Sequence, residues 1–151
     1  MNAADPGNWT GGVINQGQLR GTKFGISAAA YPNLDIASLT EAAAQTIYQR
    51  DYWMKLRGDD LPFEVALVTF DAAVNAGLRR AAIWLQQAVG VVPDGLLGDT
   101  TLAMVGQASA VAVAREALVR RVDFSSRLPS WQTFGLGWSR RFIALAAQLA
   151  S

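Results

Sequence analysis

The sequence predicts an all-α fold, or a mainly helical fold with a small β element in a long N-terminal loop. After residue 37, apolar residues recur at helical spacing between capping residues and glycines. No segment shows the sustained alternation of apolar and polar residues that is typical of strands. Residues 1–37 are rich in Gly, Asn, Pro and Asp and mostly lack helical periodicity. We therefore expect an ordered loop with short extended pieces, followed by helices.

The first helices are predicted from their caps and their apolar faces. A short helix is expected near residues 25–30. The run SLTE at residues 38–41 is a capping box, in which the Ser38 hydroxyl and the Glu41 carboxylate satisfy each other's backbone amides, and its helix should reach about Asp51. A second helix, opened by Leu61-Pro62 and ending near residue 76, is apolar nearly all round and is expected to be central and buried. A third is predicted over residues 78–89.

The remaining chain is predicted to form a connector and three further helices. Residues 91–98 carry the Pro, Asp and Gly of a turn-rich connector. Asp99 is expected to cap a short helix ending near Gly106, and a longer helix covers about residues 109–124. Pro129 interrupts the chain, Ser130 is a candidate cap for a short turn, and the last helix is predicted over about residues 137–150.

Composition excludes several classes of function. The 151 residues fit one domain, or a domain with a small appendage, and half of them are hydrophobic. A net charge of +1 gives no electrostatic footprint for nucleic acid. The absence of Cys and His removes disulfides, thiol nucleophiles, imidazole bases and histidine-ligated metals. We expect no cofactor and no metal, so carboxylates, hydroxyls, lysine or backbone groups must carry any chemistry.

The termini and the charge distribution bear on location. The N-terminus has neither a basic start nor an apolar run, so no signal peptide is expected, and no segment reaches the ~20 apolar residues of a membrane span. We expect cytoplasmic synthesis, no stable membrane insertion, and action elsewhere only after release. Most basic residues of the second half are arginines. They are either solvated helix faces or an attraction to an anionic polymer such as a cell wall.

Three groups of residues are candidates for chemistry, each with a structural alternative. Thr22 and Lys23 lie in the run GTKFGIS at residues 21–27, where glycines permit a tight backbone and polar groups often bind substrate. Trp9, Tyr52 and Trp53 are either core residues or platforms on which sugar rings stack.

The third group is a pair on the second helix. Asp71 and Asn75 lie one helical turn apart on an otherwise apolar helix. They are either a structural pair or part of a cleft wall where Asn75 binds substrate amides.

These pieces, in this order, resemble glycoside hydrolase family 108, the phage-type and prophage lysozymes. The N-terminal resemblance rests on DPGNWTGG at residues 5–12, GTKFGIS at 21–27, Tyr31-Pro32, Asp35-Ile36 and IYQRDYW at 47–53. FDAAVNAG at residues 70–77, LQQAVGV at 85–91 and PDG at 93–95 resemble the predicted peptidoglycan-binding region that follows in that family. WQTFGLGW at residues 131–138, followed by two arginines after Ser139, is similar to the family's C-terminal signature.

The resemblance implies a lysozyme-like, mainly helical fold and an N-acetylmuramidase. Such a glycosidase hydrolyses the β-1,4 bond between N-acetylmuramic acid and N-acetylglucosamine of peptidoglycan, as a bacteriophage or prophage endolysin does in cell wall degradation. It implies a truncated glycoside hydrolase region over residues 1–69 and a peptidoglycan-binding helical region over residues 70–151, packed as one globular unit. The expected partner is the peptidoglycan glycan strand, bound by a monomer at the cell wall or in the periplasm.

The resemblance also implies site residues. Asp5 and Thr22 are expected in supporting catalytic roles. The substrate-binding residues are expected to line one cleft; they are Trp9, Lys23, Phe24, Tyr52, Trp53 and Asn75.

The family's catalytic acid has no counterpart in this sequence. In the family a helix ending in Glu-Gly-Gly-Tyr precedes the Asp-Pro-Gly segment, and its glutamate is taken as the acid. Glu-Gly-Gly does not occur here, and the glutamates are Glu41, Glu64 and Glu116. Either the helix is encoded upstream of Met1, or the chain is a true truncation with lost or weakened activity. The alternatives are a non-catalytic peptidoglycan-binding protein and a phage structural or regulatory protein.

Overall fold

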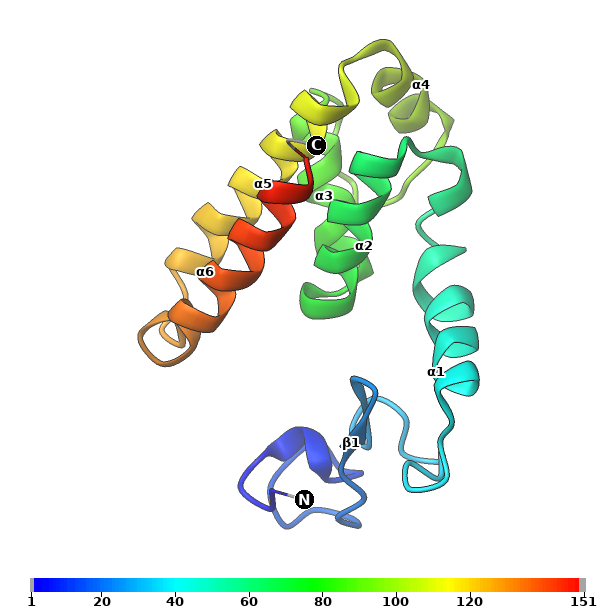
Figure 1. The fold of residues 1–151 in the computed structure, drawn as a ribbon, viewed down its shortest axis with the longest axis vertical. Coiled ribbons are helices and arrows are strands. Elements are labelled where there is room, and N and C mark those ends of the chain that lie inside the picture. The colour runs from blue at the N-terminus through cyan, green and yellow to red at the C-terminus, as the bar shows by residue number, and fades with distance from the viewer. Residues whose placement is uncertain (1, 150–151) are drawn as a thin grey trace. The chain divides into compact units, whose positions relative to one another are not determined.

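Residues 2–149 are described in the computed structural model of the protein (Figure 1). Their contacts divide the chain into two units, Met1–Gln49 and Arg50–Ser151, and each is described by itself. The functional boundary expected at residues 69/70 falls inside a helix of the second unit and stays a prediction.

The first unit is a long loop, a β-hairpin and one helix. A 3-10 turn, η1 (Pro6–Asn8), precedes the antiparallel strands β1 (Thr22–Lys23) and β2 (Ile26–Ser27). Phe24 and Gly25 join the strands with φ of 51° and 78°, the left-handed pair that suits a two-residue hairpin. The expected β element is confirmed. The helix predicted near residues 25–30 is wrong, because these two positive φ values reverse the chain and the segment pairs with β1.

The helix of the first unit is α1 (Glu41–Tyr48), and its cap differs from the prediction. Thr40 is the N-cap, and its side chain accepts a hydrogen bond from the Ala43 amide at 3.2 Å. The Ser38 hydroxyl instead donates to the Asp35 carbonyl. The predicted SLTE capping box is therefore wrong, because Ser38 still belongs to the preceding turn. The small core of this unit consists of Ile26, Ala28, Ile36, Leu39, Ala44 and Ile47.

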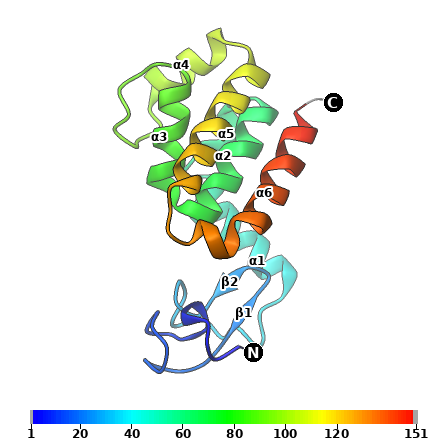
Figure 2. The ribbon, with the colours of Figure 1, turned by 90° about the vertical axis from the view of Figure 1, so that its left-hand side faces the viewer.

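The second unit is a helical bundle. A π-helical turn, η2 (Gln49–Trp53), and a 3-10 turn, η3 (Gly58–Asp60), lead into it. The helices that follow are α2 (Phe63–Ala76), α3 (Leu78–Ala88), α4 (Asp99–Gln107), α5 (Ala110–Ser126) and α6 (Trp131–Gln148). Helices α2, α3 and α5 pack on one another, and α6 returns antiparallel along α5 (Figures 1 and 2).

The buried core of the bundle confirms that α2 is central. Val65 and Val68 of α2 and Leu85 of α3 are almost fully buried together with Ala114 of α5. Gly77, with φ of +89°, ends α2 and directly precedes α3. The mainly helical fold with a small β element, predicted from helical periodicity, is therefore confirmed.

Two helix starts in the second unit differ from the prediction. Gly98 is the N-cap of α4, and Asp99 is already in its first turn, where its carboxylate pairs with Arg57 at 2.6 Å. Helix α6 begins at Trp131, not near residue 137. Its two glycines lower helix propensity. However, Gly135 is buried against the Trp131 ring, and this contact stabilises the helical turn that contains both residues.

Within residues 2–149, no helix taken singly has the length and apolar character of a membrane span. The pair α4 and α5 meets those criteria jointly, by length and composition alone, with a bend of 119° between its members.

Candidate functional site

Asn8 organises the loop that holds the predicted catalytic residues. Its buried side chain donates to the Asn2 carbonyl at 2.9 Å and accepts the Thr22 hydroxyl at 2.8 Å. Its backbone carbonyl accepts hydrogen bonds from the amides of Arg20 and Gly21. One buried amide side chain thus ties η1 to β1. The sequence analysis missed this role, although Asn8 lies inside the DPGNWTGG run.

Asp5 and Thr22 are connected through this Asn8 centre. Asp5 is the N-cap of η1, and one of its carboxylate oxygens accepts the Gly7 amide at 2.8 Å. Asn8 is the last residue of that turn, and its Oδ1 receives the Thr22 hydroxyl proton. The Gly7 carbonyl in turn accepts the Ala29 amide just after β2. The two residues predicted to support catalysis therefore belong to one hydrogen-bonded loop, with the Asp5 carboxylate exposed.

Lys23 and Phe24 lie at the tip of the hairpin. The Lys23 ammonium donates to the Ala37 carbonyl at 2.9 Å and lies 5.5 Å from the Phe24 ring centroid. The Phe24 carbonyl accepts the Tyr48 hydroxyl at 3.0 Å, which fixes the turn to α1. The Phe24 ring is 47% exposed, so it is available as an apolar surface for a ligand.

Trp9 is half-buried beside this loop. Its backbone forms a β-bridge with Leu19, and its indole N–H donates to the Ala3 carbonyl at 2.9 Å. The ring is therefore held in one orientation, as a stacking platform requires, and its role in sugar binding stays a prediction.

Tyr52 and Trp53 lie in the second unit, in the π-helical turn. Trp53 packs edge-on to Phe70 with ring centroids 5.8 Å apart, and its indole N–H donates to Asp59 at 2.8 Å. A Cβ at Gly58 would lie 2.4 Å from the Trp53 ring, so that glycine is required for this packing. Both aromatics are half-buried against the core of the bundle. Their packing gives them a structural role besides the predicted one.

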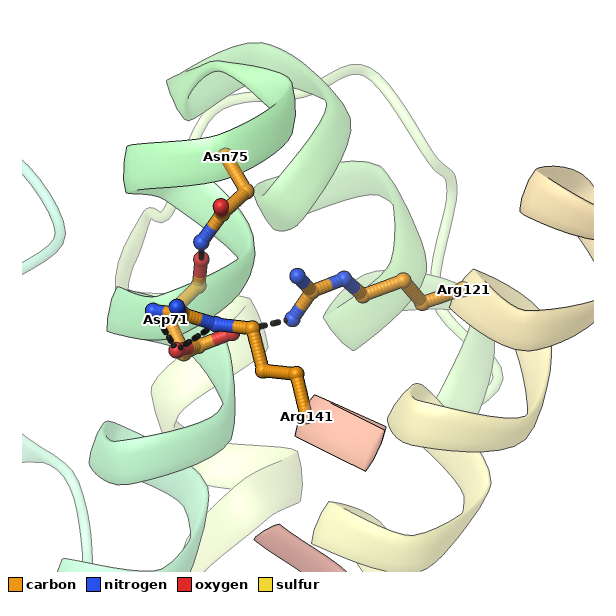
Figure 3. Close-up of polar contacts among 4 residues, drawn as sticks. All are labelled: Asp71, Asn75, Arg121 and Arg141. Atoms are coloured by element: carbon orange, nitrogen blue, oxygen red, sulfur yellow. Dashed lines mark hydrogen bonds and ion pairs between the residues drawn. The ribbon is translucent and has the colours of Figure 1, made fainter. Parts of the chain in front are cut away.

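Asp71 and Asn75 share a face of α2, as predicted, but they do not form a side-chain pair (Figure 3). The exposed Asn75 amide donates to the backbone carbonyl of Asp71 at 2.8 Å. The Asp71 carboxylate instead pairs with Arg121 of α5 and Arg141 of α6, each with a closest contact of 2.5 Å (Figure 3). Arg121 is buried and lies over the Phe142 ring at 4.9 Å.

This ion-pair cluster joins three helices. Burial of the Asp71 carboxyl opposes its ionisation, but the hydrogen bonds from Arg141 and Arg121 outweigh it and hold the pKa of Asp71 below its ordinary value. The expectation that Arg121 either faces solvent or attracts an anionic polymer is wrong, because its guanidinium is buried and neutralised within the bundle.

A general acid for glycoside cleavage needs a carboxyl whose pKa is raised. Three carboxyls of the described residues, those of Asp35, Asp71 and Asp94, move the other way. Hydrogen bonds from Ser38 lower the pKa of Asp35, and hydrogen bonds from Gln86 and the Leu96 amide lower that of Asp94. With Asp71, these carboxyls are held ionised and are unsuited to donate a proton.

The glutamates do not supply the acid within the N-terminal loop. Glu41 and Glu64 lie in the first turns of α1 and α2, and Glu116 pairs with Arg120 at 2.8 Å on α5. Residues 2–40, which hold Asp5 and Thr22, therefore contain no glutamate, and the supporting roles of these two residues stay predictions. In the part of the chain that the structure describes, no three acidic side chains gather as metal ligands.

Comparison with known proteins identifies the class that this fold and loop define. The profile described as glycosyl hydrolase 108 matches residues 1–77, about half of the chain. The solved structure of SagA from Brucella abortus is 34% identical in sequence, with a TM-score of 0.79, over 85% of this chain and 79% of that chain. A search of curated proteins finds no match.

The chain belongs to the glycosyl hydrolase 108 family. The profile covers the whole first unit and continues through α2, so it includes every predicted site residue from Asp5 to Asn75. The resemblance noted in the sequence is thereby confirmed, and the chain is a member of a glycosidase family.

Proposed function

We propose that this protein provides the glycan-binding and supporting catalytic part of a peptidoglycan N-acetylmuramidase. The observation that carries the proposal is that the family match includes the Asn8-centred loop, in which Asp5 and Thr22 are held by hydrogen bonds. A glycan strand would bind along this loop, with Trp9 and Phe24 as its apolar contacts. Tyr52, Trp53 and Asn75 are proposed, separately, as glycan-contacting residues of the second unit.

The proposed reaction is hydrolysis of the β-1,4 bond between N-acetylmuramic acid and N-acetylglucosamine. A carboxylic acid protonates the bridging oxygen as the bond from the anomeric carbon to that oxygen breaks. Water adds to the anomeric carbon and releases a proton, which restores the acid over the complete cycle. The Asp5 carboxylate would stabilise the positive charge that develops at the sugar, and the Thr22 oxygen, which donates to Asn8, would accept a hydrogen bond from water or substrate.

Residues 2–40 contain no glutamate that could act as the proton donor of this reaction. A positioned general acid contributes roughly a hundred- to ten-thousand-fold to such a rate. We therefore expect the 151-residue chain to bind peptidoglycan and to hydrolyse it weakly or not at all. As a phage-type endolysin, the complete activity would act on the bacterial cell wall after release, as a monomer.

The test compares three forms of the protein on purified cell-wall suspensions, followed by loss of turbidity. The first is the 151-residue chain, and the second carries a fused helix ending in Glu-Gly-Gly-Tyr ahead of Met1. The third has the same extension with glutamine in place of its glutamate. We expect hydrolysis by the second form, at least about a hundred-fold faster than by the other two. Equal rates for all three would contradict the proposal that this glutamate donates the proton while the 151-residue chain binds the glycan.

A non-catalytic peptidoglycan-binding protein is the second candidate function. It is favoured by the lack of a glutamate in residues 2–40, which include the Asn8-centred loop. It predicts that all three forms sediment with purified peptidoglycan and that none of them hydrolyses it.

A further inference from the structure

A groove between α3 and α5 lies on the bundle and has no part in the site proposed above. It has a volume of about 730 Å³, and its walls combine arginines, the carboxylates of Glu116 and Asp123, and apolar side chains. Arg80 and Gln87 of α3 line one side, and Arg120 of α5 and Arg127, the C-cap residue of α5, line the other. Ile83, Trp84 and Val119 contribute its apolar lining.

The Phe124 ring holds the Arg80 guanidinium in place in the groove. The guanidinium lies 4.1 Å from the centroid of the Phe124 ring, and that ring packs on Trp84 at 5.6 Å. Within residues 2–149, no carboxylate forms an ion pair with Arg80. A guanidinium that is oriented by an aromatic ring loses little freedom when it binds a carboxylate through two parallel hydrogen bonds.

The α5 wall adds two arginines whose present partners are easily exchanged. Arg120 pairs with Glu116 at 2.8 Å, and Arg127 pairs with Asp123 at 2.6 Å. Both pairs are solvent-exposed, and such pairs hold their charges weakly. The Nε atom of Arg120 is buried and has no hydrogen-bond partner.

We propose that this groove binds the peptide that peptidoglycan carries on N-acetylmuramic acid, through its free carboxylates. The inference rests on the proposed function, because it names a second part of the same polymer. Stem peptides combine small apolar residues with carboxylates at intervals of one or two residues. The apolar lining accommodates the small apolar residues of the peptide. The guanidinium groups of Arg80, Arg120 and Arg127 bind its carboxylates. Gln87 contributes an amide for the peptide backbone.

The test measures binding of a soluble disaccharide–tetrapeptide fragment of peptidoglycan to the 151-residue chain, by calorimetry and by NMR of the Arg80 Nε–H and Gln87 amide signals. We expect the Arg80→Gln variant to bind about ten-fold more weakly. The matched control is Arg140→Gln, which removes the same charge from an exposed position on α6 outside this groove. It should bind as the unmodified chain does. Thermal melting of both variants checks that neither loses its fold.

The comparison ligands separate this inference from the proposed function. The disaccharide without peptide should bind more weakly and leave the Arg80 and Gln87 signals unmoved. If it binds as tightly as the fragment with peptide, the stem-peptide site is wrong while the glycan-binding function stands. If neither ligand binds, both proposals fail. Equal losses in the two arginine variants, or displacement of the peptide by millimolar inorganic phosphate, would also overturn the inference.

Discussion

The two units of this protein are ordered by different interactions. In the first unit, side-chain hydrogen bonds from Asn8 and Tyr48 fix a loop whose backbone adopts left-handed φ at four glycines, at Asn15 and at Phe24. In the second unit, helices α2, α3 and α5 bury a continuous apolar core, and a charged cluster around Asp71 joins α2, α5 and α6.

The hydrogen-bonded loop of the first unit and the packed bundle of the second meet two different requirements of a glycosidase. Residues that handle a polar substrate must be exposed yet fixed, and hydrogen-bonded loops achieve this with little apolar burial. A scaffold gains its stability from packed apolar surface. We therefore expect substitutions in the first unit to act through particular bonds and backbone angles, and substitutions in the second to act through burial.

The largest expected effect is at the buried charge cluster. Asp71→Asn would remove the carboxylate that neutralises Arg121, whose side chain is only 5% exposed. Breaking a buried pair in this way costs about 3–5 kcal/mol in the free energy of unfolding. The control Asp123→Asn breaks the exposed pair with Arg127 and should cost less than about 1 kcal/mol. Urea unfolding at neutral pH measures both; equal losses would contradict the burial argument.

Acid unfolding provides a second measure of the same cluster. Because the pKa of Asp71 is lower in the folded protein than its ordinary value of 3.8, its stabilising contribution is complete above that value. The contribution is lost as the pH falls through the lowered pKa, so stability declines with acid. The free energy of unfolding of Asp71→Asn should depend less steeply on pH below about 4 than that of the unmodified chain. An identical slope would show that Asp71 is not held ionised.

A smaller effect is expected at the hairpin turn of the first unit. In Gly25→Ala, the new Cβ would lie 2.4 Å from the Tyr48 hydroxyl at a φ of +78°. The left-handed conformation and the displaced hydroxyl together should cost about 2–3 kcal/mol. Hydrogen exchange should show the loss at the Lys23 and Ile26 amides, which pair across the turn.

The control for this turn is the double variant Gly25→Ala with Tyr48→Phe. Removing the hydroxyl removes the nearest clash, since the next ring atom lies 3.7 Å from the built Cβ. The double variant should recover part of the protection at β1 and β2. Equal protection in the single and double variants would show that the hydroxyl contact is not the cause.

The smallest effects compare two glycines in α6. A Cβ at Gly135 would lie 2.9 Å from the Trp131 ring, so Gly135→Ala should destabilise the protein by about 1–2 kcal/mol. A Cβ at Gly137 meets nothing within 4 Å, so Gly137→Ala should stabilise the helix by about 0.5–1 kcal/mol. Shifts of the urea midpoint in opposite directions are expected. Shifts of the same sign would contradict the packing of Trp131.

The helices of the second unit were largely predictable from local signals. Gly77 and Gly90, both with positive φ, mark the ends predicted for α2 and α3. Helix α5, predicted from about residue 109, begins at Ala110 with Ser109 as its N-cap. The start of α6 was missed because it depends on Trp131 packing over Gly135, a tertiary contact that propensity does not contain.

The loop and the charge cluster were less predictable for the same reason. Phe24 adopts a left-handed φ that no rule assigns to phenylalanine, so the turn was missed and the strand Ile26–Ser27 fell within a predicted short helix. The resemblance to the family named Thr22, but its partner Asn8 lies 14 residues away, and Arg121 lies 50 residues from Asp71. Such pairs are formed by the fold, and the local pattern of one sequence does not reveal them.

The most direct test of the muramidase proposal is the identity of the sugar at each new reducing end. Peptidoglycan digested by the chain extended with the Glu-Gly-Gly-Tyr helix can be reduced with borohydride and its products sequenced by mass spectrometry. We expect reduced N-acetylmuramic acid at the new ends, and none when the glutamate of the extension is glutamine. Reduced N-acetylglucosamine at those ends, or products released equally by the glutamine form, would contradict it.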